Sequence, residues 1–122
     1  AMLLNSSPAR CAMVPTLNDH GFSDRVLESR GYVGVAFIDF FSIPCDHFRP
    51  ELEALSELLE QKVRFFSVDV SENPSLTEYM AVEAVPTLIL FRDGEEAARY
   101  EGPYSREALN ERITSLMSGK PA

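Results

Sequence analysis

The sequence predicts an α/β protein in which helices cover both faces of a mixed central β-sheet. Strand-like and helix-like segments alternate along the chain, and residues 32–40 are almost continuously apolar. A strand with such a run is covered on both faces, so it belongs in the middle of a sheet. With 122 residues, 45% of them hydrophobic, the chain can enclose one core. We expect one domain over residues 16–122, after a loosely ordered N-terminal arm over residues 1–15.

The first half of the chain predicts a helix, a strand and a longer helix. Asn18 precedes apolar residues at helical spacing and Gly31 follows them, so we expect a short helix between the two. The central strand over 32–40 comes next. The second helix is expected from Ser42 to about residue 61. Pro50 lies inside it and removes one backbone donor, which predicts a bend.

The second half predicts three strands and two helices. Asn73 is a candidate helix cap, and Pro74 after it suits the first helical position. Asp93 and Gly94 suit the turn of a β-hairpin, and Ser105 suits the cap of the last helix. In chain order we expect a strand over 63–70, a helix from 74, strands over 86–91 and 96–101, and a helix after 105.

Apolar side chains mark the buried face of the two longer helices. They recur at the spacing of three and four residues that places them on one side of a helix. In the second helix they are Leu52, Leu55, Leu58 and Leu59, and in the last helix they are Leu109, Ile113 and Leu116. We expect both faces to lie in the core.

The charge of the chain argues against two classes of partner. It has 11 basic and 19 acidic residues and a formal net charge of -8, which repels nucleic-acid phosphates and anionic lipid surfaces. No run approaches the roughly 20 apolar residues of a membrane-spanning helix. Cys11 and Cys45 are too few for a disulfide scaffold or a structural zinc site, and they favour a reducing cytoplasm. We therefore expect no metal, no cofactor, no nucleic acid and no membrane.

Several short motifs stand in a common register. They are the segment 35–45, which ends in Ser42, Ile43, Pro44 and Cys45, followed by Pro50, Val85-Pro86-Thr87, Asp93-Gly94 and Gly102. With these motifs, residues 16–118 resemble the thioredoxin family. The resemblance implies the thioredoxin fold, places Pro44 and Cys45 in the last two positions of the redox motif, and makes Pro86 the cis-proline that faces this motif.

The same comparison shows that the redox centre is incomplete. The family's attacking thiol corresponds to Ser42, and an alcohol has no appreciable alkoxide population without an activating base. The family's buried acid corresponds to Ala36 and its lysine partner to Ser67. The usual tryptophan is replaced by Phe41 and the usual glycine by Ile43. Without an attacking thiolate, the exchange of a dithiol with a disulfide stops at its first step.

Two explanations of the missing thiol stay open. Ser42 is either native or an engineered replacement of the attacking cysteine, although an engineered change at this one position does not account for the loss of the buried charge pair. Cys45 is either a reactive thiol or, like most buried cysteines, an inert hydrophobe. In the first case Cys11 could resolve the mixed disulfide.

The resemblance also indicates a surface that survives the loss of the thiol. A cis Pro86 exposes the backbone N–H and C=O of Val85 beside Ser42, where they can pair with an extended peptide. We expect this surface to bind polypeptide clients, so that the protein acts as a chaperone, adaptor or assembly factor. The alternative is a thiol-disulfide oxidoreductase that acts through Cys45. The candidate motif positions are Ser42 and Cys45, and the candidate binding residues are Phe41, Ile43, Pro44, Val85, Pro86 and Gly102.

Overall fold

A computed structural model describes residues 14–40 and 42–119. Cys11 and Phe41 therefore lie outside the described residues, as do residues 1–13 of the expected arm. The elements are α2 (Asp19–Phe22), the π-helix η1 (Ser23–Leu27), β2 (Tyr32–Ile38), α3 (Ile43–Leu58), β3 (Val63–Asp69), α4 (Pro74–Tyr79), β4 (Thr87–Arg92), β5 (Glu95–Glu101) and α5 (Arg106–Met117).

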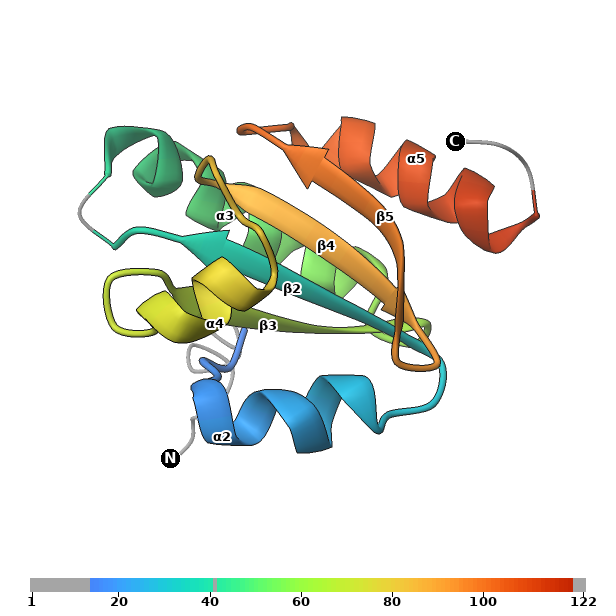
Figure 1. The fold of residues 1–122 in the computed structure, drawn as a ribbon. Helices are drawn as coiled ribbons and strands as arrows, with labels where there is room; N and C mark the ends of the chain where they lie inside the picture. Colours follow the sequence, from blue (N-terminus) through green and yellow to red (C-terminus); the bar gives the residue numbers. More distant parts are fainter. Residues whose placement is uncertain (1–13, 41, 120–122) are drawn as a thin grey trace, which may run out of the picture.

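The sheet has the strand order β3-β2-β4-β5 (Figure 1). Strand β2 pairs in parallel with β3 and antiparallel with β4, and β4 pairs antiparallel with β5. Six of the seven residues of β2 are buried, as the apolar run over 32–40 predicted. The prediction of a mixed sheet with this strand in its interior is confirmed.

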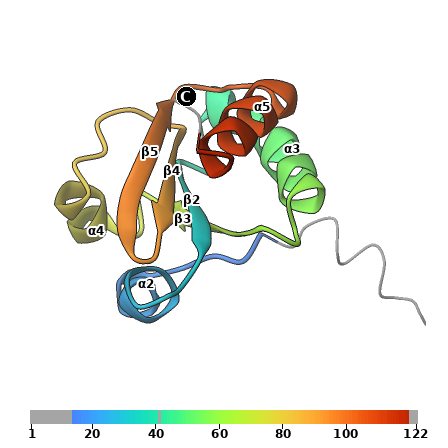
Figure 2. The same cartoon turned by 90° about the vertical axis from the view of Figure 1, so that its right-hand side faces the viewer.

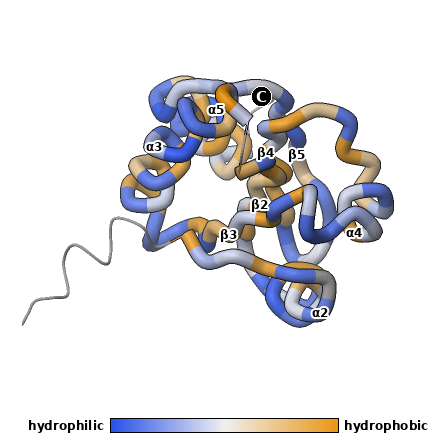
Figure 3. Tube along the Cα trace, turned by 90° about the vertical axis from the view of Figure 1, so that its left-hand side faces the viewer, coloured by the Kyte–Doolittle hydropathy of each residue, from blue (hydrophilic) through white to orange (hydrophobic). Residues whose placement is uncertain are grey.

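Helices cover both faces of the sheet (Figure 2). Helices α3 and α5 lie on one face, and α2, η1 and α4 lie on the other. Successive side chains of a strand point to opposite faces, so Ala36 and Ile38 of β2 join the α3–α5 core, whereas Val35 and Phe37 join the α2–α4 core. Figure 3 shows apolar segments along the strands and alternating polar and apolar segments along the helices.

The first helical segment differs from the expected single helix. Asn18 caps it, because its side chain accepts the N–H of Gly21. The segment then widens from an α-helix into η1, in which the N–H of Glu28 bonds to the C=O of Ser23 at 2.9 Å. The widened turn lays the Leu27 carbonyl against the hairpin turn at Gly94, which has room for it because glycine has no Cβ.

One side chain of the predicted leucine face is not in the core. Leu52, Leu55 and Leu59 are buried, but Leu58 is 59% exposed. At 100° per residue the three buried leucines point within about 60° of one another, and Leu58 points about 90° from their mean direction. The spacing of three residues therefore correctly predicted a helix, but the prediction that Leu58 lies in the core is wrong.

The expected cap at Asn73 has the right position but another hydrogen bond. Its side chain makes no bond to the first turn of α4, and its Nδ2 donates instead to the C=O of Asp69 at 3.0 Å. It thus ties the helix start to the end of β3. At Ser105 the expected cap is present, since its Oγ accepts the N–H of Ala108.

Helix α3 is continuous from Ile43 to Leu58 and includes Pro50, which the sequence placed inside it. Ahead of α2, residues Pro15 and Leu17 pair with β3, because the N–H of Ser67 donates to Pro15 and the N–H of Leu17 donates to Ser67. None of the helices within 14–40 and 42–119 has the length and apolar character that crossing a membrane requires.

Candidate functional site

The register of the sheet brings the predicted site residues to one end of the strands. Phe37, near the end of β2, pairs with Thr87 at the start of β4, and Thr87 pairs with Glu101 at the end of β5. The segment that leads into α3 therefore begins beside Pro86. Gly102 follows β5 at the same end, and its N–H donates to the C=O of Pro86 at 2.8 Å.

Cys45 lies in the first turn of α3 and is fully buried. Its Sγ accepts the backbone N–H of Asp39 at 3.2 Å, so the sulfur is used as an acceptor by the segment that precedes the helix. Its other neighbours belong to the apolar α3–α5 core. The thiol is free and unbridged among the described residues, and its surroundings suit a small buried hydrophobe.

Ser42 is the N-cap residue of α3 and is half-buried. Its backbone is extended, its N–H donates to Asp39, and its C=O accepts the first helical bond from Asp46 at 3.0 Å. Its hydroxyl makes no capping bond. The next side chain, Ile43, is 70% exposed although it is apolar, and Pro44 beside it is exposed too.

The place of the family's buried charge pair is occupied by Ala36 and Ser67. They are direct partners in the β2–β3 register, and they are 0% and 6% exposed. No acid lies at either position. Within 14–40 and 42–119 the buried carboxylate is that of Asp69, and it accepts hydrogen bonds from the N–H and Oγ of Ser71. Neither Ala36 nor Ser67 therefore supplies an acid for proton transfer to Cys45.

The Val85–Pro86 peptide bond is cis, and Val85 is half-buried. Neither its backbone N–H nor its C=O has a hydrogen-bond partner among the described residues. The flanking residues are held on both sides: the Oγ1 of Thr87 donates to the C=O of Ala84 at 2.6 Å, and Pro86 accepts from Gly102. The unpaired backbone N–H and C=O of Val85 therefore belong to a segment whose neighbouring residues are held in place.

The sequence did not indicate a contact between two residues on either side of the motif, Phe40 and Arg49. Phe40 is 39% exposed, and the guanidinium of Arg49 lies over its ring, 4.8 Å from the centroid. Arg49 also forms an ion pair with Asp46 at 2.8 Å. Phe40 closes an apolar run and Arg49 stands one helical turn after Cys45, so spacing alone gave no signal of this stacking.

The structure brings Ser42, Ile43, Pro44, Cys45, Val85, Pro86 and Gly102 to the same end of the sheet, and Phe41 is outside the described residues. In the described part of the chain no group of three His, Cys, Asp or Glu side chains is placed to hold a metal ion. What this end of the sheet offers is one buried thiol, one hydroxyl, exposed apolar surface and unpaired backbone groups.

Known proteins resemble the chain along most of its length. The family model for thioredoxin matches residues 13–115. Thioredoxin X, chloroplastic, of Arabidopsis thaliana is 34% identical over 116 residues, which cover 93% of this chain and 64% of that protein. The thioredoxin of Rickettsia bellii is 30% identical over 103 residues, which cover 84% of this chain and 98% of that protein.

The thioredoxin of Chlamydia trachomatis is 35% identical over 100 residues, which cover 80% of this chain and 92% of that protein. The chain spans less than two thirds of the chloroplastic relatives, 64% of thioredoxin X and 58% of thioredoxin Y1. The match of the family model to residues 13–115 covers all four strands of the sheet, Cys45 and Pro86. The chain belongs to the thioredoxin family.

Proposed function

We propose that this chain binds extended segments of other polypeptides without a two-thiol redox cycle, as a chaperone, adaptor or assembly factor. The binding surface, here called the client surface, consists of Ile43, Pro44, Val85 and Gly102 around Pro86, which is itself buried. Ser42 and the buried Cys45, the remnant of the redox motif, flank Ile43 and Pro44 in the sequence.

The unpaired backbone of Val85 is the observation that carries this proposal. A peptide in extended conformation can donate to its C=O and accept from its N–H, as in the addition of a strand to a sheet edge. Backbone bonds of this kind are indifferent to the client's sequence. Ile43, 70% exposed, supplies apolar contact area beside them. Both features are independent of the thiol.

The state of the two motif positions supports the absence of the redox cycle. Disulfide exchange begins with a thiolate that reaches a sulfur of the substrate. The first motif position holds the hydroxyl of the half-buried Ser42, and the sulfur of Cys45 is 0% exposed. A client disulfide would meet an alcohol first.

A thiol-disulfide oxidoreductase that acts through Cys45 is the second candidate. It is favoured by the similarity to proteins named thioredoxins, at 30 to 35% identity. This function requires Cys45 to become accessible, which means that the first turn of α3 opens and that the bond from Asp39 is lost.

Client binding tests the first candidate. The probe is a reduced, carboxymethylated polypeptide that stays unfolded and carries a fluorophore, and its anisotropy reports binding. I43S should weaken binding about fivefold, because the apolar contact of Ile43 is removed. L58S is the matched control, since Leu58 is an apolar side chain of the same helix that is 59% exposed and lies outside the client surface. Equal losses in I43S and L58S, or no binding by the unmodified chain, would contradict the proposal.

The reduction of insulin disulfides by dithiothreitol separates the two candidates. The unmodified chain and C45A should give the same rate, and C45A should bind the unfolded probe as the unmodified chain does. A rate well above that of C45A would establish thiol chemistry at Cys45 and overturn the non-redox proposal. The codon at position 42 in the encoding gene decides whether Ser42 is native.

The remaining predictions belong to this proposal. A cytoplasmic location, the absence of nucleic-acid partners and the division of the chain at residue 15 follow from composition and charge. They are tested by cell fractionation, by electrophoretic mobility with nucleic acid, and by limited proteolysis.

A further inference from the structure

We infer that Arg99 is a positioning residue for the client surface, because its guanidinium holds the start of the segment 80–86 that presents Val85. The inference rests on the proposed function. It concerns a residue of β5, on the face of the sheet opposite to α3.

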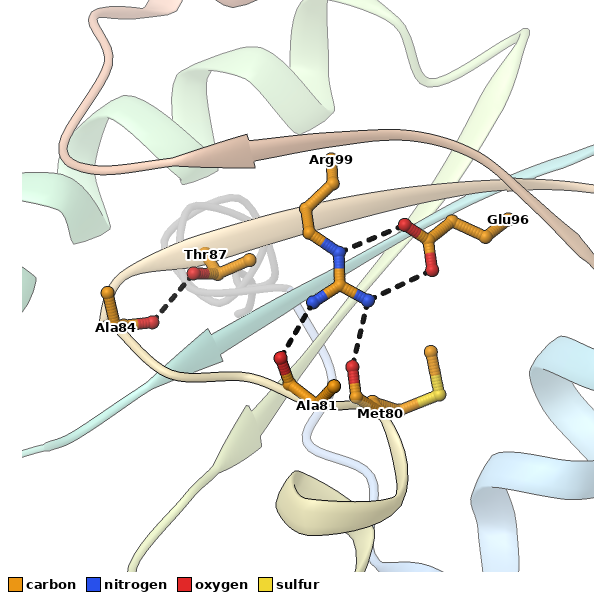
Figure 4. A network of polar contacts seen from close by, with 6 residues as sticks. All are labelled: Met80, Ala81, Ala84, Thr87, Glu96 and Arg99. Carbon is orange, nitrogen blue, oxygen red and sulfur yellow. Dashed lines mark hydrogen bonds and ion pairs between the residues drawn. The ribbon is translucent and has the colours of Figure 1, made fainter.

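Arg99 joins β5 to the end of α4 through one planar group (Figure 4). Its Nη2 donates to the C=O of Met80 at 2.8 Å, and its Nη1 donates to the C=O of Ala81 at 3.1 Å. Its Nε and Nη2 donate to the two carboxylate oxygens of Glu96, both at 2.9 Å. The bidentate contact with Glu96 orients the guanidinium, so its remaining donors point at the two carbonyls in a fixed direction.

The backbone at Ala81 needs this support. Helix α4 ends there with the N–H of Ala81 bonded to Glu78 and the N–H of Val82 bonded to Thr77, at 2.9 and 3.0 Å. This pair of bonds is the Schellman ending, whose turning residue is usually glycine. Ala81 adopts it with a φ of 55°, a left-handed conformation that costs an alanine free energy. The bonds from Arg99 to the adjoining carbonyls offset that cost.

The segment is anchored at its other end as well. Thr87 bonds to the C=O of Ala84, and Gly102 bonds to the C=O of Pro86. Between these anchors and those of Arg99 lie only Val82 and Glu83. With so short a connection, a displacement of the carbonyls at 80 and 81 is passed on to Val85. Arg99 therefore fixes where the free N–H and C=O of the client surface stand.

The ionic state of the contact is constant over the usual pH range. The hydrogen bond from Arg99 lowers the pKa of Glu96, and the same bond raises the pKa of Arg99. A lysine in its place would keep the charge but lose the planar fork that reaches a carboxylate and two carbonyls together.

R99M tests the inference, and R106M is its matched control. Arg106 makes the same kind of contact, an ion pair with Glu51 at 3.3 Å, but it ties α5 to α3 and makes no bond to the segment 80–86. The affinity of each variant for the unfolded probe is measured at a temperature at which both variants are fully folded. R99M should weaken binding about fivefold, through the loss of two hydrogen bonds to a charged donor, and R106M should leave it unchanged. Equal effects of the two variants would overturn the inference.

Two readouts distinguish positioning from a general loss of stability. Amide hydrogen exchange of Ala81 and Val82 should become about tenfold faster in R99M but not in R106M. A81G in the R99M background should restore most of the binding, because glycine adopts the left-handed conformation without support. Unchanged exchange in R99M, or no recovery with A81G, would contradict the inference. Exchange needs no client, so it decides on Arg99 even if the unmodified chain fails to bind the probe and the proposed function is wrong.

Discussion

Substitution of Gly94 by alanine tests how tightly the turn between β4 and β5 packs on the first helical segment. A Cβ added at Gly94 would lie 2.2 Å from the carbonyl oxygen of Leu27, and the φ of Gly94 is 86°. Gly31 has nearly the same φ of 83°, but a Cβ there would meet nothing within 4 Å. G94A and G31A therefore share the conformational cost, and only G94A adds the clash.

The magnitude follows from these distances. The left-handed conformation costs an alanine about 1 kcal/mol, and G31A should lose that amount. A carbon and an oxygen approach to about 3.3 Å, so in G94A the turn must withdraw from Leu27 by about 1 Å. That movement breaks the two bonds between Asp93 and Gly31, at 2.9 and 2.7 Å. At about 1 kcal/mol for each bond, G94A should lose about 3 kcal/mol in total.

Equilibrium unfolding in urea gives both free energies. The expected result is that G94A destabilises the protein by about 2 kcal/mol more than G31A does, without a change in the slope of the transition. Free energies of unfolding that agree within about 0.5 kcal/mol would refute the close packing of the turn on Leu27.

Core packing, helix capping and an ion pair lead to three other expectations. L55A removes a fully buried side chain of α3 and should cost 2–5 kcal/mol in urea unfolding, and a loss below about 1 kcal/mol would contradict that burial. S105A removes the cap on Ala108 and should cost about 1 kcal/mol by the same assay, whereas no loss would mean that the cap bond contributes nothing. Arg99 keeps the pKa of Glu96 below its ordinary value of 4.5, so this carboxylate stabilises the fold fully above that pH and the contribution is lost as the pH falls below it. E96Q should therefore show a smaller loss of thermal stability on acidification than the unmodified chain, and an identical pH profile would contradict the ion pair.

The fold could be predicted because each element has its own start and stop signals. Asn18 and Ser105 act as the caps that their positions indicated, and their side chains accept the N–H groups of Gly21 and Ala108. The apolar run over 32–40 gave the buried strand of the sheet interior. What spacing could not decide was the direction of a single side chain such as Leu58, because three- and four-residue intervals both fit a helix while only an arc of it is buried.

Only the part of the site that short sequence motifs mark could be predicted. The burial of Cys45 and the closeness of Pro86 to the start of α3 were expected from the resemblance, and both are found. The contacts of Arg99 were not expected, because its partners Met80 and Ala81 are 19 and 18 residues away and lie on another element. An alanine in the sequence does not predict a left-handed backbone, because glycine or asparagine usually occupies such a position.

The two halves of the site depend on different layers of the molecule. The thiol belongs to the α3–α5 core, where Ala36 and Ser67 replace a charge pair of the family. The segment that carries Val85 is held from the opposite face, by Arg99 at one end and by bonds to Thr87 and Gly102 at the other. Substitutions that remove acid, lysine and attacking thiol from the first half therefore leave the supports of the second half in place. The proposed function therefore predicts that a change at Cys45 leaves the binding of extended polypeptides intact.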